Sequence, residues 1–290
     1  MNTQTGRIEN EPHEVYHGQH DKPAFGSGAI KLWITDREQF YRTYVTNEIQ
    51  RPMLGRAGVI GNAVEEPLLE GTNRNMVSST KTATAQKFKA EQEENPNKLL
   101  LTPSEADMVD AVVQAGMDDK LLQSVTDAGT PQVTYRIDVG PFYVQCRIDV
   151  EAEVNQLVPE TIDELNLSGT TKLLVDLKTT ATLYGSNGFQ RAAVKVPLLY
   201  PIQEALYTEI VRTVDKVDQH RIPFWFCAIA KDDPAVQWVQ FQDIHSKARK
   251  RVMGAIGELK VNFESGCWDE FKGKTRTVFL PENYLDWAGE

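Results

Sequence analysis

The chain has 290 residues, of which 41% are hydrophobic and 25% are charged, so its composition is that of a globular protein with a sizeable core. No apolar stretch approaches the roughly 20 residues that a membrane-spanning helix needs, and the first residues lack the apolar core of a secretory signal. The 3 cysteines stand far apart without metal-ligand spacing, which argues against a disulfide framework and a zinc site. We therefore expect a cytoplasmic protein with reduced cysteines and no membrane partner.

The charge balance is acidic, with 31 Lys and Arg residues against 41 Asp and Glu residues and a formal net charge of −10. Proteins that bind nucleic acid usually neutralise phosphates with Lys and Arg, so this balance counts against such a partner. Its weight is limited, because net charge describes the whole surface and a binding channel needs only a local basic lining.

The N-terminal part of the chain predicts a short arm followed by helices. Residues 1–24 have little periodicity and predict a flexible arm, whereas residues 25–290 predict a single domain. A helix that Ser27 can cap, and a second helix over residues 36–45, carry apolar residues suited to the core. A short third helix is expected over residues 62–70.

A mainly helical insertion is expected over about residues 76–128. Residues 80–94 are polar and rich in helix-favouring types, which predicts a solvated helix. Thr102 and Pro103 are typical cap and first-turn residues, so another helix is expected to begin there and to pack against a sheet.

The middle of the chain predicts strands. Residues 133–139 and 142–150 are β-branched runs joined through Gly140-Pro141, which indicates a hairpin. Alternation along the second run places Val144, Cys146, Ile148 and Val150 on one face and Gln145, Arg147 and Asp149 on the other. A carboxylate therefore sits on a strand otherwise built for burial.

The remaining elements follow in alternation. In chain order we expect a strand over 173–178, a helix over 199–214, strands over 224–230 and 236–241, a long helix over 244–263, and a closing tail that includes Trp287. His220 and His245 lie in polar surroundings and are expected at the surface. Together the elements predict an α/β fold with a mixed central β-sheet flanked by helices.

Three of these segments carry groups that suit phosphodiester hydrolysis. Hard divalent cations such as Mg²⁺ prefer oxygen ligands, polarise the phosphate and lower the pKa of an attacking water. Asp149 ends one strand, while Asp176 and Lys178 share a face of the next because strand side chains alternate. The Leu177 backbone carbonyl offers a further ligand, and Glu65 from the early helix, or Glu66 as its alternative, would complete the site.

A lysine and a helix would support this site. Lys178 would orient or help to deprotonate the attacking water and offset charge on the phosphate. Gln203 and Tyr207, one helical turn apart, would contact the substrate backbone or brace that lysine.

Each signal is weak alone. A strand-borne Asp-x-Lys triplet arises often by chance, Asp149 alone would more often be a strand-end carboxylate, and a stripe of Tyr200, Gln203 and Tyr207 would more often be the flank of a packed helix. The hypothesis depends on the order of these motifs along the chain, because unrelated chance matches seldom occur together in the expected order.

The ordered set resembles the RecE-type (exodeoxyribonuclease VIII-like) exonucleases of the PD-(D/E)xK nuclease superfamily, which are related to phage lambda exonuclease. The matching runs are CRID at 146–149, DLKTTA at 176–181 and YPIQEALY at 200–207. The likeness covers most of the chain from about Tyr16 onward and is thin over 72–130 and at the C-terminus. Where the RecE-type helix has His, this chain has Glu65, as lambda exonuclease-like sequences do.

The resemblance implies a fold, an activity and partners. It implies a PD-(D/E)xK core that holds Mg²⁺, with Mn²⁺ as a substitute, through Asp149, Asp176, Glu65 and the Leu177 carbonyl. It further implies 5′ to 3′ degradation of one strand from duplex DNA ends, a homo-oligomeric ring, and a single-strand annealing partner in recombination or repair. Substrate contacts would come from Gln203, Tyr207, Tyr200, Arg147 and Thr179.

Two other functions remain open. One is a RecB- or YqaJ-like nuclease on the same fold that prefers single strands or cuts within a duplex. The other is a non-catalytic module that keeps the fold for DNA or protein binding, which the acidic balance favours and the presence of Asp149, Asp176 and Lys178 opposes. No phosphate-binding loop of the ATPase type is present, so we expect no ATP-driven movement.

Overall fold

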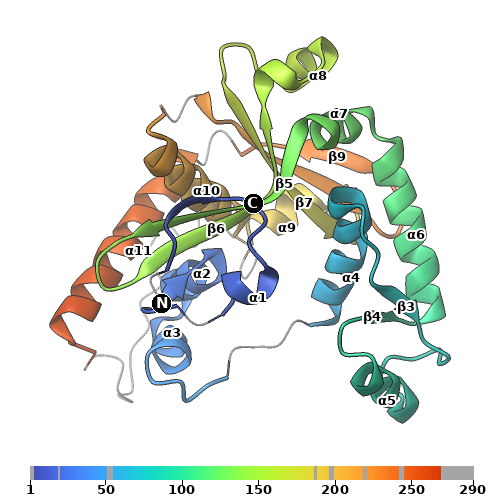
Figure 1. Cartoon of the computed structure of the whole chain (residues 1–290), viewed down its shortest axis with the longest axis horizontal. Coiled ribbons are helices and arrows are strands. Elements are labelled where there is room, and N and C mark those ends of the chain that lie inside the picture. The colour runs from blue at the N-terminus through green and yellow to red at the C-terminus, as the bar shows by residue number, and fades with distance from the viewer. Residues whose placement is uncertain are drawn as a thin grey trace.

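A mixed β-sheet with helices packed on both faces forms the centre of the computed structural model, which describes residues 3–18, 20–50, 55–185, 188–195, 199–217, 221–241 and 245–268 (Figure 1). Within these residues, a 7-stranded sheet has the order β1-β5-β6-β7-β8-β9, and β2 pairs with β6. Its strands are β1 (Gly6–Ile8), β2 (Ala24–Phe25), β5 (Gly129–Asp138), β6 (Tyr143–Glu153), β7 (Lys172–Thr180), β8 (Phe224–Ala230) and β9 (Val236–Val239). The predicted α/β fold, with a mixed sheet flanked by helices, is confirmed.

The central strands combine antiparallel and parallel pairing. Strands β5 and β6 form the hairpin expected from the sequence, and β6 runs antiparallel to β7. Strand β7 then runs parallel to β8, so the chain must cross over between them, and helices α9 (Phe189–Ala193) and α10 (Tyr200–Asp215) lie in this crossover. Strand β9 returns antiparallel after the expected turn.

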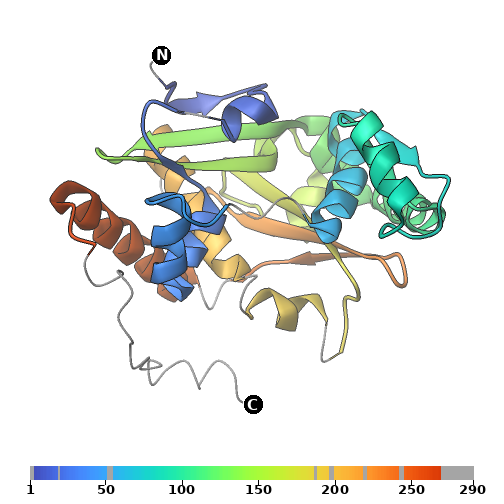
Figure 2. The same ribbon diagram turned by 90° about the horizontal axis from the view of Figure 1, so that it is seen from below.

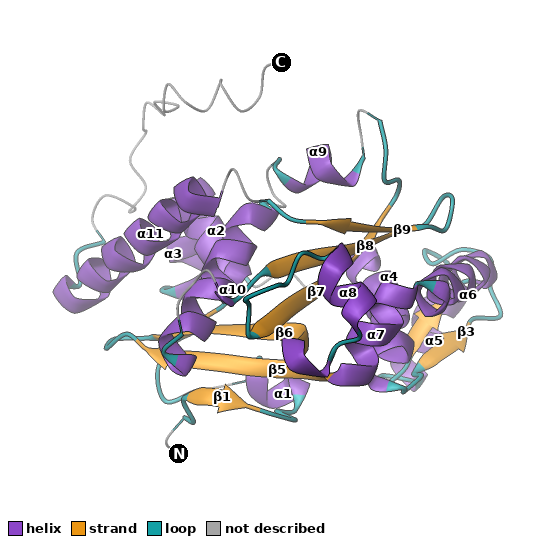
Figure 3. Ribbon diagram, turned by 90° about the horizontal axis from the view of Figure 1, so that it is seen from above, coloured by secondary structure: helices purple, strands orange, loops and turns teal. Residues whose placement is uncertain are grey.

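The helices divide into two groups on the two faces of the sheet (Figures 2 and 3). One hydrophobic cluster joins the sheet to α2 (Ser27–Thr35), α3 (Arg37–Tyr44), α10 and α11 (His245–Ser265). The other joins it to α4 (Arg56–Glu65), α6 (Pro103–Asp118) and α7 (Lys120–Ala128). The remaining elements are α1 (His13–Tyr16), α5 (Gln86–Glu94), α8 (Pro159–Glu164), the π-turn η1 (Glu66–Glu70), the 3₁₀ turn η2 (Val154–Gln156), and the paired strands β3 (Asn75–Val77) and β4 (Leu99–Leu101).

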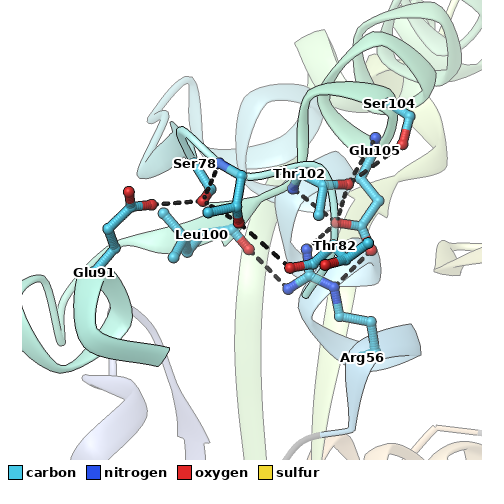
Figure 4. A network of polar contacts seen from close by, with 9 residues as sticks. Arg56, Ser78, Thr82, Glu91, Leu100, Thr102, Ser104 and Glu105 are labelled. Carbon is cyan, nitrogen blue, oxygen red and sulfur yellow. Dashed lines mark hydrogen bonds and ion pairs between the residues drawn. The ribbon is translucent and has the colours of Figure 1, made fainter. Parts of the chain in front are cut away.

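Helix α4 is anchored at its first residue. The Arg56 guanidinium donates to the Glu105 carboxylate and, over 2.7 Å, to the carbonyl oxygen of Leu100 (Figure 4). Glu105 also closes the capping box with Thr102 that starts α6, as the sequence predicts. The pair thus joins α4 to β4 and α6, and fixes the helix that leads to Glu65.

The N-terminal segment differs from the expected flexible arm. Strand β1 pairs with β5, and β2 pairs with β6. The Arg136 guanidinium, 1% exposed, donates to the Glu11 carboxylate over 2.9 Å and to the carbonyl oxygen of Gln4. Strands of two or three residues leave too little periodicity to be recognised, and the buried ion pair joins residues far apart in the chain.

One prediction of side-chain direction was wrong. Ile148 packs in the cluster with α10, but Val150 packs in the opposite cluster, although simple alternation puts both on one face. Between them, Asp149 lies opposite Gln132, whose φ of 54° interrupts the ladder between the pairs Pro131–Val150 and Val133–Ile148. The side chains on either side of Asp149 in β6 therefore pack on opposite faces of the sheet.

Helix boundaries also differ from expectation. Ser27 is the first residue of α2, after a Gly26 cap, and accepts no capping hydrogen bond. Helix α4 begins at Arg56, earlier than expected, and the insertion includes the strand pair β3–β4 as well as helices. The polar helix α5 begins only at Gln86. The tail around Trp287 lies outside the described residues, as does His220. Among the described helices, none combines the length and apolarity needed to span a membrane.

Candidate functional site

Two strand carboxylates meet in the centre of the sheet. Antiparallel pairing sets Val150 opposite Val175, which places Asp149 beside Asp176. The backbone N–H of Leu177 donates to the Asp149 carboxylate over 2.7 Å. Asp149 is 9% exposed and Asp176 is 1% exposed, so both carboxyl groups lie in a largely dry setting. Such groups require close compensating partners.

Lys178 supplies one such partner. Its ammonium forms an ion pair with Asp176 and donates over 3.2 Å to the carbonyl oxygen of Leu177. Burial disfavours the ammonium, but Asp176 and Asp149 outweigh it and raise the pKa of Lys178. A cation thus already contacts the Asp176 carboxylate and the Leu177 carbonyl, two groups that the sequence analysis places in a metal site.

Helix α10 closes one side of the site. The Gln203 amide donates to the Asp176 carboxylate over 2.6 Å. The Tyr200 ring stacks between Phe189 and Phe226, with centroids 5.5 and 5.3 Å away. The ammonium of Lys178 lies 5.6 Å from the Tyr200 ring centroid. Gln203 therefore holds Asp176 through a hydrogen bond, whereas the Tyr200 ring lies beside Lys178.

Tyr207 and Thr179 lie at the margins of the site. Tyr207 is buried, its ring contacts Phe224 at 6.0 Å, and it lines the groove described below. Thr179 is half-buried and lies close to Gly61, where an added Cβ atom would come within 3.9 Å of the threonine hydroxyl. Helix α4 and strand β7 therefore pass near each other at the site.

Helix α4 brings Glu65 to the site, and the two candidate glutamates separate clearly. The Glu65 carboxylate accepts from the Gln132 amide over 2.5 Å. The Glu66 carboxylate instead binds the Arg74 guanidinium, with Nε 3.0 Å from Oε1 and 3.1 Å from Oε2. Glu65 is the member of the pair whose charge acts on Asp149.

The acids repel one another through a dry medium. Burial raises the pKa of Asp149 well above its ordinary value, and the neighbouring Glu65 and Asp176 add to that rise. Burial also raises the pKa of Glu65, against the opposing effects of Lys178 and the Gln132 bond. Carboxylates held together at this cost are typical of sites that receive a cation.

A groove of about 1430 Å³ leads to these acids and is lined by Glu65, Asp149, Tyr207 and Arg147, among others. Within the described residues, the buried Nε and Nη1 atoms of Arg147 have no hydrogen-bond partner. The guanidinium lies 5.9 Å from the Tyr16 ring centroid. Arg147 therefore has donor capacity left for an anion in the groove.

The sequence did not predict a place near the site for two residues, Gln132 and Lys31. Gln132 precedes the recognised strand run and shows its role only through its contact with Glu65. Lys31 was assigned to a core-facing helix, yet its ammonium lies 3.4 Å from the Gln203 amide oxygen and 5.1 Å from the Tyr200 ring centroid. Burial, with the charge of Lys178, lowers the pKa of Lys31 to about 7. Both contacts join distant segments, so no local pattern reveals them.

His245 also differs from expectation. It is not simply a surface residue, because its Nδ1 lies 3.4 Å from the buried carboxylate of Glu204. This pair belongs to α10 and α11, and does not join the acids at Asp149.

The donor chemistry suits a hard divalent cation. Three carboxylates and one backbone carbonyl are oxygen ligands of the kind that Mg²⁺ and Mn²⁺ prefer. In the described part of the chain, however, no three His, Cys, Asp or Glu side chains are arranged as a finished metal site. Protein groups hold the acids instead: Leu177 N–H on Asp149, Lys178 on Asp176 and Gln132 on Glu65.

Comparison with solved structures gives a likeness of fold. The crystal structure of a Eubacterium rectale protein named "Putative exonuclease" superposes with a TM-score of 0.54 at 14% sequence identity, covering 96% of this chain and 98% of that one. The chain shares this fold.

Other comparisons add little. SSO0001 gives a TM-score of 0.33 at 10% identity, covering 84% of this chain and 81% of that one. Rai1 from Scheffersomyces stipitis gives 0.27 at 12% identity, covering 83% and 70%. Both scores are too low to support an argument. No protein-family model and no curated protein sequence matches the chain.

Proposed function

We propose that the chain is a divalent-metal-dependent DNA nuclease with a PD-(D/E)xK core. The observation that carries the proposal is the meeting of Asp149, Asp176 and Lys178 on adjacent strands. Glu65, from helix α4, lines the same groove as Asp149 and acts on it electrostatically. The fold shared with a protein named as an exonuclease supports the proposal.

The proposed metal site uses oxygen donors. Asp149, Asp176, Glu65 and the Leu177 carbonyl would hold Mg²⁺, or Mn²⁺ in its place. The bound ion would supply Lewis-acid polarisation of the phosphate and a water of lowered pKa. Glu66 is the weaker alternative because Arg74 already engages its carboxylate.

The remaining residues would position the reactants. The Lys178 ammonium would orient the attacking water and offset charge on the phosphate. Gln203 would keep Asp176 in place through its 2.6 Å hydrogen bond. Arg147 would offer its unpartnered N–H groups to a DNA phosphate, with Tyr200, Tyr207 and Thr179 lining the approach.

The finer activity follows from the likeness to RecE-type exonucleases. We propose degradation of one strand from duplex ends, 5′ to 3′, which leaves 3′ single-stranded overhangs for recombination. A homo-oligomeric ring around DNA would help an acidic subunit, with a formal charge of −10, to retain its substrate. A single-strand annealing protein would be the partner that receives the overhang.

The test compares DNA forms and variants. Linear duplex, covalently closed circular duplex and single-stranded DNA are each incubated with the full chain and Mg²⁺ or EDTA. We expect Mg²⁺-dependent release of mononucleotides from linear duplex, no cutting of circles, and loss of activity in Asp176→Asn and Lys178→Ala. Asp110→Asn, an exposed change on α6, is the matched control and should remain active.

Each alternative gives a different result. Cutting of closed circles would replace the exonuclease by an endonuclease, and preference for single strands would indicate a RecB-like specificity. Duplex binding without any metal-dependent cleavage would indicate a non-catalytic module. Full activity in both site variants would refute the assigned site.

A further inference from the structure

Gln132 has an unusual backbone conformation for a residue within a strand. Its φ of 54° lies in the left-handed region, which is strained for a non-glycine residue and persists only where the surroundings enforce it. It lies between the paired positions Pro131 and Val133 of β5, opposite Asp149 of β6. The strain therefore falls beside a candidate catalytic acid.

The Gln132 side chain contacts the helix that carries Glu65. Its amide nitrogen donates to Glu65 Oε1 over 2.5 Å, joining β5 to the last residue of α4. Both residues line the same groove as Asp149. Glu65 stands where α4 gives way to the π-turn η1, so its own backbone lies at an irregular point of the helix.

We propose that Gln132 is a positioning residue that aims the Glu65 carboxylate toward Asp149 and Asp176. This inference rests on the proposed function and extends it by one residue outside the motif set. A neutral amide suits the task because it engages one oxygen of Glu65 and leaves the other for a cation. A lysine there would instead bring a positive charge that repels the ion.

A purely structural role predicts something different. If Gln132 only joined β5 to α4, removing its amide would change the stability of the protein and leave metal affinity alone. Two variants separate these roles, because both lack the amide but only one of them relieves the backbone strain. Gln132→Gly relieves the left-handed strain, and Gln132→Met retains it with a side chain of similar length.

A matched control tests strain relief by itself. Lys216 has a φ of 56° at the C-terminal end of α10, about 20 Å along the helix from Gln203 at a rise of roughly 1.5 Å per residue. Lys216→Gly therefore relieves similar strain away from the groove. It should raise the melting temperature without changing the site.

The experiment is titration calorimetry of Mn²⁺ into the full chain, with thermal melting of the same samples in EDTA. We expect both Gln132 variants to bind Mn²⁺ about 10–100-fold more weakly, as for other residues that orient a metal ligand. Gln132→Gly should melt no lower than wild type, Gln132→Met no higher, and Lys216→Gly should keep wild-type affinity.

Other outcomes overturn the inference. It is refuted if both variants bind Mn²⁺ within twofold of the wild-type affinity, or if the Mn²⁺ affinity of the variants follows their melting temperatures. It is also refuted if the wild type does not bind Mn²⁺. A DNA digestion run in parallel separates this failure from that of the proposed function. If the Gln132 variants bind Mn²⁺ more weakly than wild type, but the wild type itself does not cleave DNA, the positioning role is supported and the proposed nuclease function is refuted.

Discussion

Asp149 shows how a buried acidic side chain can lower the stability of the fold that holds it. It is 9% exposed, faces two other acids, and has a pKa raised by burial first and by Glu65 and Asp176 next. Its compensation is the Leu177 N–H and the charge of Lys178. A carboxyl group whose pKa is raised in the folded protein makes the fold less stable as pH rises above its ordinary pKa, because the dry site disfavours ionisation.

Asp149→Asn should therefore stabilise the metal-free protein. Asparagine still accepts the Leu177 N–H but carries no charge, so we expect the melting temperature in EDTA at pH 8 to rise by about 2 °C or more. The same variant should lose Mg²⁺-dependent cleavage. Asp110→Asn, on the exposed face of α6, is the control and should change neither. A fall in melting temperature would contradict the account of strained acids.

The sequence predicted that three of these residues lie close together. Asp149, Asp176 and Lys178 are visible because strand alternation and motif order are local properties. Glu65 and Glu66 could not be separated, since the decision depends on Arg74 and Gln132, which approach from other segments. Val150 was misassigned because it packs in the opposite hydrophobic cluster from Ile148, whereas simple alternation places both on one face.

Helix α4 illustrates how an element positions a residue at its far end. The Arg56 bond to Glu105 lowers the pKa of Glu105 to about 2, against the opposing effect of burial. Because the pKa of Glu105 is lower in the folded protein, its ionised form stabilises the fold at pH values above the ordinary pKa of 4.5. This stabilisation is lost as the pH falls toward about 2. The contact is partly exposed, so solvent screens it.

Arg56→Met should accordingly destabilise the protein by about 1–2 kcal/mol at pH 7. Melting temperatures at pH 7, 5 and 3 are expected to show the gap to wild type narrowing as Glu105 becomes protonated. Arg42→Met, which removes the exposed Arg42–Glu48 pair, is the control and should have little effect at any pH. A gap that widens at low pH would refute this assignment.

Elements with long periodic or capped sequences were predictable, and short ones were not. The capping box at Thr102, the β5–β6 hairpin and helix α10 follow from local rules. Strands β1 and β2 owe their existence to partners more than 100 residues away in sequence, such as Arg136 for Gly6. A pattern of two or three residues cannot indicate such pairing.

At the scale of the whole molecule, the balance of charge is acidic, and only a few basic side chains lie near the candidate site. The formal charge is −10, yet Lys178, Lys31 and Arg147 gather about the candidate site, and Arg147 has buried N–H groups without partners in the described chain. The groove lining nevertheless carries more acidic than basic side chains, with Glu65, Glu66, Glu70 and Asp149 among the acids. A divalent ion held by these acids would reduce the negative charge that a phosphate meets there.

A crystal structure with Mn²⁺, located by its anomalous scattering, tests this central claim most directly. We expect one strong peak coordinated by Asp149, Asp176 and the Leu177 carbonyl, with Glu65 nearby and the Lys178 ammonium displaced from Asp176. A peak that lies elsewhere, or none at Mn²⁺ concentrations that saturate binding in solution, would contradict it.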